Sequence, residues 1–372
     1  MAYLTLDTRK LNYNYRYLNT RFKRNNIDWA IVSKLLCGNE LYLSTLAELG
    51  ISQICDSRIT NLKAVRKVMP EVETIFIKPP TPRTAARIAA YADISCNTSI
   101  ATIQALSDAA VSMGIVHRII IMVETGELRE GVLPENLSWF YRQIKDLPGI
   151  RVIGLGTNHA CMYGVLPSFE NLQTLENCRK MLETEFGCEL ELLSGGASVA
   201  IPLIGTEEMP ETINHFRVGE TLFFGMNVFD NTPIPSMKQD IFMLHANIIE
   251  LRQKPTQPFG NFGFNLTKDK KLPSERKKSE TSSRAILDVG LLDLDVKHLI
   301  PTDESITISG ASSDMMVVDL GKNEGAYRVG DTISFRLDYM GALRAINSRY
   351  IDKRVLADVP EFQHANRLVL AG

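Results

Sequence analysis

Eight strand-like segments, most of them separated by helical segments, lie within the first 228 residues of this 372-residue chain. Each segment is a short apolar run, which is the pattern of a buried parallel strand. Eight parallel strands with helices between them is the number that closes a (β/α)8 barrel. An open doubly wound sheet typically has fewer strands, and no Gly-x-Gly-x-x-Gly motif follows the first of these segments. The segments are 29–34, 52–57, 73–78, 92–98, 117–125, 151–158, 190–196 and 214–220.

The pattern changes after Gly225, where Asn231–Pro235 forms a stiff connection. Strand signals then follow one another without helices, which predicts an all-β second domain. We therefore expect a TIM barrel over 1–228 and a β-domain over 229–372. Residues 254–283 are rich in Pro, Lys, Ser, Asn and Gly and are expected to form a long exposed excursion. The strands expected in the β-domain are 241–251, 284–290, 305–311, 315–320, 331–339 and 343–351, whereas a strand at 3–6 and helices at 8–24, 98–113, 134–147 and 168–186 are expected in the barrel.

Composition predicts a globular, cytoplasmic protein that binds no metal ion, no nucleic acid and no membrane. Hydrophobic residues make up 45% of the chain, charged residues 23%, and the formal net charge is -2. Lysine and arginine are dispersed, which argues against nucleic-acid binding. The six cysteines show no metal-ligand spacing and are expected to be reduced thiols. The N-terminal residues lack the pattern of a signal peptide, and no apolar run is as long as a membrane span.

A single lysine, Lys34, ends the first barrel strand, and Ser194-Gly195-Gly196-Ala197-Ser198 follows the seventh. In such barrels the carboxyl ends of the strands meet at one mouth, where the chemistry takes place. Backbone N–H groups of a glycine-rich turn can approach an anion, and the Ser198 hydroxyl adds a donor. A lysine that faces this turn suggests a ligand with a carbonyl and a phosphate. Pyridoxal 5′-phosphate fits, because its aldehyde takes a lysine as a Schiff base; the alternative is an ordinary lysine whose amine reaches solvent.

The third mark is Arg217, at the end of the eighth strand. An arginine that faces the pyridine nitrogen leaves that nitrogen unprotonated, because a guanidinium does not give up its proton. The ring is then a weaker electron sink, which favours reversible proton exchange at Cα over transamination. The alternative is a structural salt bridge between Arg217 and Glu124 or Glu220.

Several motifs together resemble the alanine racemase fold of pyridoxal-phosphate enzymes, and its ornithine racemase-like branch in particular. They are VSKLLCGN (32–39), VETGELREGV (123–132), GLGTNHACMYGV (154–165), SGGAS (194–198), RVGE (217–220) and GASSDMMVVDLG (310–321). The resemblance implies that Lys34 forms the Schiff base, that Arg129 contacts the ring oxygen and the substrate carboxylate, and that Asn158 replaces a histidine. It also implies a homodimer in which 310–321 reaches the partner's barrel mouth. The expected cofactor-binding residues are Lys34, Arg129, Asn158, Ser194, Gly195, Gly196, Ser198, Arg217, Gly219 and Tyr339.

The chain departs from alanine racemases at three positions. Gly38 stands where they carry a tyrosine, Gly290-Leu291-Leu292-Asp293 lacks their second-domain tyrosine, and Met122 stands where some carry a carbamylated lysine. The second base of a two-base racemase is therefore left open by the resemblance. We expect the catalytic residues to be Lys34, Cys161 and Asp314, and the full set of candidates for the second base is Cys161, His159, Tyr163, Asp293, Asp314 and Tyr339.

The sequence thus predicts a pyridoxal-phosphate-dependent amino-acid racemase that acts on ornithine, another basic amino acid or alanine. Shared active sites are expected if 231–235 carries the second domain away from its own barrel mouth. The rival interpretations are a non-catalytic pyridoxal-phosphate-binding protein and a fold-related decarboxylase or aldolase. The possible partners for a side-chain ammonium group are Asp288, Asp293, Asp295 and Asp314.

Overall fold

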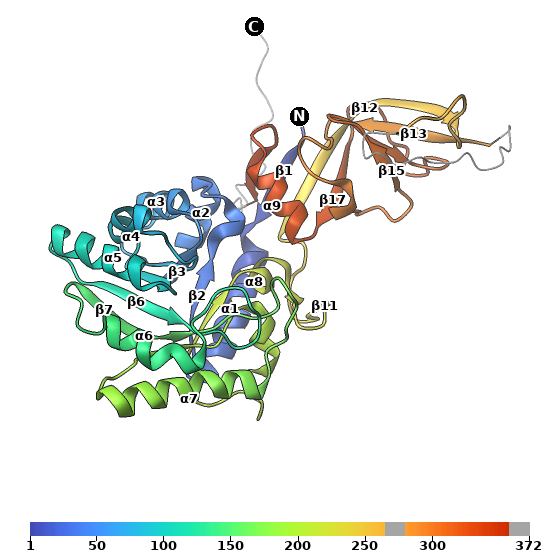
Figure 1. Ribbon diagram of the computed structural model, residues 1–372. Coiled ribbons are helices and arrows are strands. Elements are labelled where there is room, and N and C mark those ends of the chain that lie inside the picture. Colours follow the sequence, from blue (N-terminus) through green and yellow to red (C-terminus); the bar gives the residue numbers. More distant parts are fainter. Residues whose placement is uncertain (265–279, 357–372) are drawn as a thin grey trace, which may run out of the picture.

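The computed structural model describes residues 1–264 and 280–356. Figure 1 shows two bodies, a barrel wrapped in helices at the lower left and an antiparallel sheet at the upper right. Eight parallel strands close the barrel in chain order, which confirms the expected (β/α)8 architecture. The ring is completed where Ala30 pairs with Arg217. The strands are β2 (Asp28–Val32), β3 (Gln53–Asp56), β4 (Glu73–Phe76), β5 (Ile94–Asn97), β6 (His117–Met122), β7 (Ile150–Gly156), β8 (Leu192–Ser194) and β9 (His215–Val218).

The helices around the barrel follow from capping and amphipathic spacing. In the first of them, the Asp7 carboxylate accepts the N–H groups of Arg9 and Lys10, and the apolar Leu11 and Leu18 are buried. The α-helices are α1 (Thr8–Arg24), α2 (Glu40–Ala47), α3 (Ile59–Val68), α4 (Ala85–Tyr91), α5 (Ile100–Met113), α6 (Leu137–Ile144), α7 (Phe169–Phe186) and α8 (Glu220–Phe224), and the 3-10 turns are η1 (Ser33–Leu36), η2 (Pro82–Thr84), η3 (Pro134–Asn136) and η4 (Ser198–Leu203).

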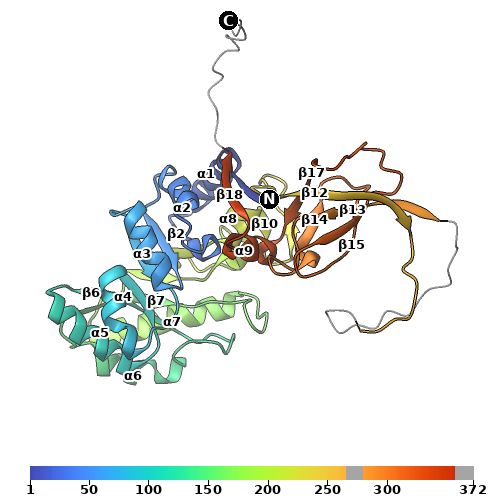
Figure 2. The ribbon, with the colours of Figure 1, turned by 90° about the horizontal axis from the view of Figure 1, so that it is seen from above.

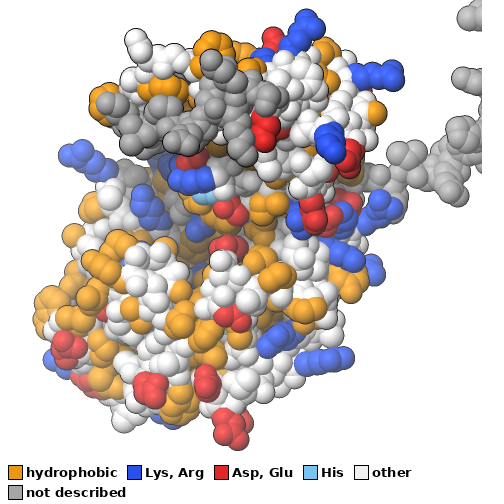
Figure 3. All heavy atoms as spheres, turned by 90° about the vertical axis from the view of Figure 1, so that its right-hand side faces the viewer, with side chains coloured by type: hydrophobic (Ala, Val, Ile, Leu, Met, Phe, Trp, Pro, Cys, Tyr) orange, Lys and Arg blue, Asp and Glu red, His pale blue; other side chains and the backbone are white. Residues whose placement is uncertain are grey.

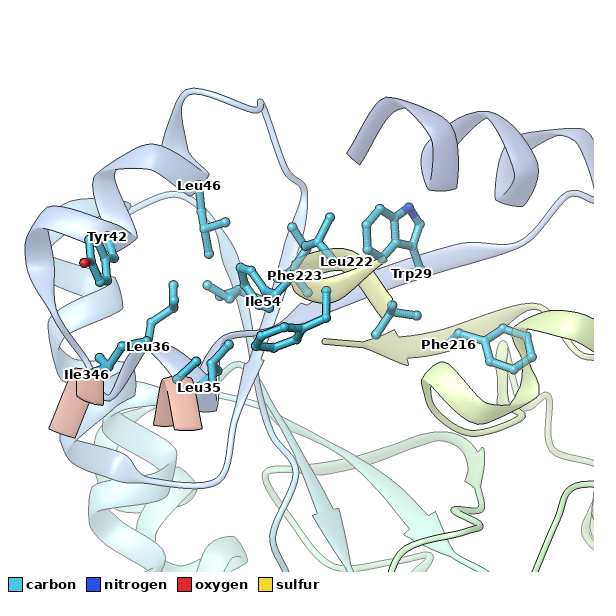
Figure 4. Packing of buried hydrophobic residues seen from close by; sticks show 14 of the residues in the cluster. Trp29, Leu35, Leu36, Tyr42, Leu46, Ile54, Phe216, Leu222, Phe223 and Ile346 are labelled. Carbon is cyan, nitrogen blue, oxygen red and sulfur yellow. The ribbon is translucent and has the colours of Figure 1, made fainter. Parts of the chain in front are cut away.

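Two layers of apolar side chains hold the barrel together. Ala30, Val32 and Ile120 belong to a separate cluster inside the ring. The alternate residues of the same strands, such as Trp29 and Phe216, belong to a larger cluster that includes residues of the surrounding helices (Figure 4). Both faces of the strands are therefore buried, which explains their continuous apolar runs.

The second body is a mainly antiparallel sheet in the order β14-β17-β12-β13-β16-β15, in which β1 pairs with β12 and β18 pairs in parallel with β1. A short hairpin of β10 (Met226–Asn227) and β11 (Thr232–Pro233) connects the two bodies. The elements of the sheet are β1 (Tyr3–Asp7), β12 (Phe242–Pro255), β13 (Thr281–Leu287), β14 (Leu299–Pro301), β15 (Thr307–Ala311), β16 (Met316–Asp319), β17 (Thr332–Leu337) and β18 (Asp352–Leu356), with η5 (Val296–His298) and α9 (Tyr339–Asn347) between them.

Two details of the second sheet differ from the expectation. The first strand of the chain, β1, pairs with β12 and with β18, although residues 1–228 were expected to form the barrel. The two ends of the expected excursion are β-strand rather than loop, because Pro255 at the end of β12 pairs with Thr281 at the start of β13. The part of the excursion at 265–279 lies outside the described residues.

The strand predicted at 343–351 is wrong, because most of it lies in α9. The Asp338 carboxylate caps this helix by accepting the N–H of Gly341 at 2.8 Å. Ala342, Ala345 and Ile346 are buried, and their spacing fits one face of a helix rather than one side of a strand.

Helix α9 brings the second domain to its own barrel, contrary to the expectation drawn from 231–235. Figure 2 shows α9 between the barrel and the sheet. Its Ile346 belongs to the same buried cluster as Leu35 and Leu36 of η1, and the three side chains are close together in Figure 4. The turn that carries Lys34 is therefore packed against a helix of the second domain.

The surface shown in Figure 3 carries acidic and basic side chains interspersed. All six cysteines are free thiols. Within 1–264 and 280–356, no helix combines the length and the apolar character that crossing a bilayer requires.

Candidate active site

A pocket of about 390 Å³ opens at the carboxyl ends of the barrel strands. Residues from both ends of the barrel sequence and from α9 line it, so distant segments of the chain converge here. Eight of the residues singled out as catalytic or cofactor-binding line the pocket: Lys34, Arg129, Asn158, Cys161, Ser198, Arg217, Gly219 and Tyr339.

Lys34 leaves the end of β2 on a turn that is anchored from below. The Ser33 hydroxyl donates to the fully buried Asp56 carboxylate at 2.9 Å, and the Asn61 amide donates to it at 3.1 Å. Burial raises the pKa of Asp56, and these hydrogen bonds act against that rise. The Lys34 Nζ lies 5.9 Å from the centre of the Tyr339 ring, so the amine faces the pocket beside α9.

Tyr339 brings a buried hydroxyl group to the pocket wall. Its phenolic oxygen is buried and has no hydrogen-bond partner within the described structure, although the ring lines the pocket. Burial raises the pKa of Tyr339, so the hydroxyl keeps its proton at neutral pH. A buried donor of this kind needs an acceptor, and a phosphate in the pocket would supply one.

Ser198 and Gly219 form the wall beside Tyr339. The Ser198 hydroxyl accepts the N–H groups of Gly219 at 3.4 Å and Thr221 at 3.3 Å, which ties the start of η4 to the start of α8. A Cβ atom on Gly219 would lie 3.1 Å from the Val32 carbonyl oxygen, so the close approach of β2 favours glycine. The backbone is thereby brought to the pocket surface, where Gly219 and Ser198 both line the pocket.

Arg217 is fixed by a buried chain of hydrogen bonds. Its guanidinium donates to the Ser194 hydroxyl and, at 2.6 Å, to the Thr157 carbonyl oxygen. His215 Nδ1 lies 2.9 Å from the same Ser194 oxygen, and its Nε2 lies 3.1 Å from the Gln53 side chain. Burial and the nearby Arg217 lower the pKa of His215 to about 3, so this imidazole is neutral.

The alternative role considered for Arg217 was a salt bridge. Among the described residues, no ion pair joins Arg217 to Glu124 or Glu220. The Arg217 residue is 4% exposed and lines the pocket, and no carboxylate of the described residues takes part in its hydrogen-bond network. It is therefore available to a ligand in the pocket.

Three residues of the glycine-rich turn do not line the pocket, although they were expected to bind the cofactor. Ser194 is fully buried, the N–H of Gly195 donates to the His215 carbonyl oxygen, and the Gly196 carbonyl oxygen accepts the N–H of Arg217. The pocket lining on this segment begins at Ala197. The reason is that 194–196 continue the strand pairing of β8 with β9, which keeps them below the barrel mouth.

Arg129 and Glu130 form a charged pair that lines the pocket. The Glu130 carboxylate accepts both Nε–H and Nη2–H of Arg129, and both side chains line the pocket. The hydrogen bond to Glu130 raises the pKa of Arg129, with a further contribution from the Cys161 thiol. Sequence analysis missed Glu130, although its signal was a carboxylate directly after the predicted arginine. Met122 also lines the pocket.

The barrel residues proposed as the second base occupy different environments. Cys161 lines the pocket and is exposed. His159 also lines it, but its Nε2 lies 2.9 Å from the Thr125 hydroxyl, and burial lowers its pKa to about 4. Tyr163 is 67% exposed and does not line the pocket. The loop that carries them is held by Glu127, which sequence analysis did not single out.

The acidic residues of the second domain do not line this chain's pocket. Asp288 accepts the N–H of Asn247 at 2.7 Å, and Asp293 accepts the Ser348 hydroxyl at 2.8 Å. Asp295 pairs with Lys297, whereas Asp314 is exposed near the end of a loop. Within the described ranges, no three His, Cys, Asp or Glu residues converge as metal ligands.

Residues 6–227 match the model of the alanine racemase N-terminal domain. The chain belongs to this family. It is 35% identical to ornithine racemase of Acetoanaerobium sticklandii over 95% of this chain and 99% of that protein. It is 28% identical to lysine racemase of Thermotoga maritima over 94% of this chain and 97% of that protein.

The alanine racemase fold extends over both bodies. Alanine racemase of Bartonella henselae, solved with covalently bound pyridoxal phosphate, matches with a TM-score of 0.71 at 16% identity. That match covers 95% of this chain and 99% of the other. The family's fold therefore includes the second sheet, beyond the N-terminal domain.

Proposed function

We propose that this protein is a pyridoxal-phosphate-dependent amino-acid racemase. The observation that carries the proposal is one pocket lined by Lys34, Arg217 and Tyr339, whose hydroxyl has no hydrogen-bond partner within the described structure. An amine, a fixed guanidinium and an unsatisfied phenol are complementary to the aldehyde, the pyridine nitrogen and the phosphate of this cofactor. The identity to ornithine and lysine racemases supports the same assignment.

The residues present fit the cofactor. Tyr339, Ser198 and the backbone at Gly219 would hold the phosphate, Arg217 would face the pyridine nitrogen, and Lys34 would hold the aldehyde carbon. When bound, pyridoxal phosphate acidifies the Cα–H bond of an amino acid that is linked to it. Ser194 and His215 keep the Arg217 guanidinium in place, where it would donate toward the pyridine nitrogen of the cofactor.

The side chains of this chain then bind the substrate and move its proton. Arg129 orients the α-carboxylate through the guanidinium N–H groups that Glu130 does not occupy. The Lys34 amine takes the Cα proton on one face and can return it there. Cys161 carries a proton on the other face, supported by its place in the pocket and its contribution to the Arg129 environment. Asp314 of the partner subunit is the alternative proton carrier.

The proposed substrate is a basic amino acid, ornithine or lysine, in preference to alanine. Both similar racemases are named for such substrates. The pocket contains two carboxylates, Glu130 and Glu220, and Glu130 lies beside the proposed α-carboxylate site. Asp288, Asp293 and Asp295 do not line the pocket, so the proposed partner for the side-chain ammonium is Glu130, which would share its carboxylate between Arg129 and the substrate.

The proposed assembly is a homodimer with shared active sites. Leu128, Met162 and Tyr163 are exposed on the loops beside the pocket, at 70%, 58% and 67%. Leu292 and Met315, beside Asp314 in the second domain, are 71% and 38% exposed. In an isologous dimer these two apolar sets would cover each other. We also propose a cytoplasmic location, with the free cysteines as support.

Incubation of the purified protein and pyridoxal phosphate with a panel of amino acids in D2O tests the activity. Chiral chromatography should show racemisation that is fastest for ornithine or lysine, with deuterium at Cα by mass spectrometry. Lys34→Ala is the control and should abolish both signals. No exchange with any amino acid would indicate a non-catalytic pyridoxal-phosphate-binding protein, and release of carbon dioxide or an aldehyde would indicate a decarboxylase or an aldolase.

A further inference from the structure

The carboxylate of Glu127 is buried inside a loop of backbone N–H groups. Its Oε1 accepts the N–H groups of Cys161 at 3.1 Å, Met162 at 2.6 Å and Tyr163 at 2.8 Å. Its Oε2 accepts the N–H of Val165 at 3.2 Å. The Glu127 residue is 3% exposed. Hydrogen bonds from several N–H groups to one carboxylate are charge-assisted and stronger than neutral ones.

The loop around this carboxylate has little else to hold its shape. Its side chains Met162 and Tyr163 are mostly exposed, so apolar burial contributes little. Ala160 has a φ of 51°, a left-handed conformation that is costly for a residue other than glycine. The loop closes where the N–H of Ala160 donates to the Val165 carbonyl oxygen at 2.8 Å. Glu127 therefore supplies the charge around which 160–165 folds.

Glu127 also joins two walls of the pocket. It precedes Arg129 by two residues, whereas the loop that it binds contains Cys161. Both Arg129 and Cys161 line the pocket. The carboxylate thus fixes the segment that binds the substrate carboxylate relative to the segment that carries the thiol.

We infer that Glu127 is a positioning residue that holds the Cys161 loop over the pocket, at a fixed place relative to Arg129. This inference rests on the proposed racemase function, in which Arg129 binds the substrate and Cys161 faces it. Glu127 itself does not line the pocket and acts through the loop. Its burial acts to raise the pKa of its carboxyl group, but the hydrogen bonds from Tyr163 and the other N–H groups lower it overall, so the carboxylate stays ionised at neutral pH.

The variants Glu127→Gln and Glu127→Ala test this role. Glutamine keeps one oxygen for the N–H groups but loses the charge and places an amide NH2 near the N–H of Val165. Alanine removes every acceptor. The matched control is Glu124→Gln, because the Glu124 carboxylate accepts the N–H groups of Gly126 and Leu128 in its own segment and none from 160–165.

Two measurements do not require a racemase assay. Hydrogen–deuterium exchange of the 161–165 amides should accelerate in Glu127→Gln, and more in Glu127→Ala, but should stay at the wild-type rate in Glu124→Gln. Alkylation of Cys161, which is exposed while the other five thiols are buried or half-buried, should change rate in the Glu127 variants only. Circular dichroism must match the wild-type spectrum, and Glu127→Asp serves as the test variant if Glu127→Ala does not fold.

The kinetic measurement separates positioning from mere loop stability. We expect kcat for the preferred amino acid to fall about 10- to 100-fold in Glu127→Gln, because small misplacements of reacting groups are costly. KM should change less, since Arg129 remains, and Glu127→Asp should recover part of kcat. The inference would be overturned if amide exchange of 161–165 stayed at the wild-type rate in Glu127→Gln and Glu127→Ala. It would also be overturned if amide exchange became faster while kcat kept its wild-type value. A wild-type protein that racemises no amino acid would instead overturn the proposed function.

Discussion

The two sides of the pocket are built in different ways. On the side of β8, β9 and α9, Arg217, Ser194 and His215 form a buried chain of hydrogen bonds. On the side of the loops after β6 and β7, the exposed segment 160–165 is held by the single carboxylate of Glu127. The first arrangement suits a permanently held cofactor, whereas the second leaves room for a substrate and a partner chain. The proposed function thus assigns rigidity to one side and access to the other.

The largest expected effect tests whether the open side is completed by a second chain. If Asp314 of the partner subunit completes the site, Lys34→Ala and Asp314→Ala homodimers should each be inactive, whereas an exchanged mixture should regain activity. A heterodimer with shared sites has one site with both changes and one with neither. Random exchange should therefore restore roughly a quarter of the wild-type rate.

Native mass spectrometry should confirm the exchange before the rate is interpreted. Inactive variants that exchange without recovery would place Lys34 and Asp314 in one site of one chain. An active Asp314→Ala homodimer would remove Asp314 from the site, and Asp293 would then be tested in the same way.

The next effect tests the buried side. Arg217→Gln should lower racemisation about 100-fold, because a preorganised charge at the ring is lost. It should also lower the free energy of unfolding of the cofactor-free protein by about 1.5–3 kcal/mol, since Ser194 and the Thr157 carbonyl oxygen lose a charged donor. Urea titration measures the second effect. Normal stability together with normal activity would show that Arg217 serves neither purpose.

A smaller effect compares one buried histidine from each side. The pKa values of His215, about 3, and His159, about 4, lie below that of an unfolded histidine, about 6.5. The unfolded state therefore binds more protons in acid, so the stabilisation is complete above about pH 6.5 and is lost as the pH falls. Each histidine should account for a loss of about 2 kcal/mol between pH 7 and pH 5.

Urea titrations at both pH values measure this loss. His215→Gln and His159→Gln should each reduce the difference between pH 7 and pH 5 by that amount. If a variant keeps the wild-type difference between pH 7 and pH 5, the histidine that it lacks has the same pKa in the folded and unfolded states.

The smallest expected effect concerns substrate choice on the open side. Glu130→Gln should raise KM for ornithine about threefold to tenfold, the value of a partly exposed ion pair, and should leave KM for norvaline nearly unchanged. The same change at Glu220, the other carboxylate of the pocket, is the matched comparison. Equal changes for both amino acids in Glu130→Gln would show that Glu130 orients Arg129 rather than binding an ammonium group.

Much of the buried side could be predicted from the sequence, because its key residues follow directly on strands. Lys34 and Arg217 stand at strand ends, and closing the barrel brings such ends together. Ser194 and Gly195 were expected at the pocket surface but lie beneath it. Local sequence does not show how far the pairing of β8 with β9 continues.

The open side was less predictable. Glu127 and Glu130 look like ordinary charges on a loop, and only the folded backbone shows what they contact. Helix α9 was mistaken for a strand, although Asp338 is a good N-cap and Ala342 and Ile346 share one face. The partners of β1 could not be predicted, because a strand's own residues do not identify its neighbour.

The pairing of Tyr3–Asp7 with Asp352–Leu356 joins segments at opposite ends of the described chain. The barrel is thereby an insertion within the fold of the second sheet. This sheet cannot be completed until residues separated by the whole barrel have met, and such distant contacts slow folding. A cut near residue 228 would leave an unpaired strand on the barrel fragment and an exposed edge on β12 of the other fragment. Separate expression of the two bodies should therefore give aggregation-prone fragments, whereas a permuted chain that moves β1 behind β18 would keep the sheet intact.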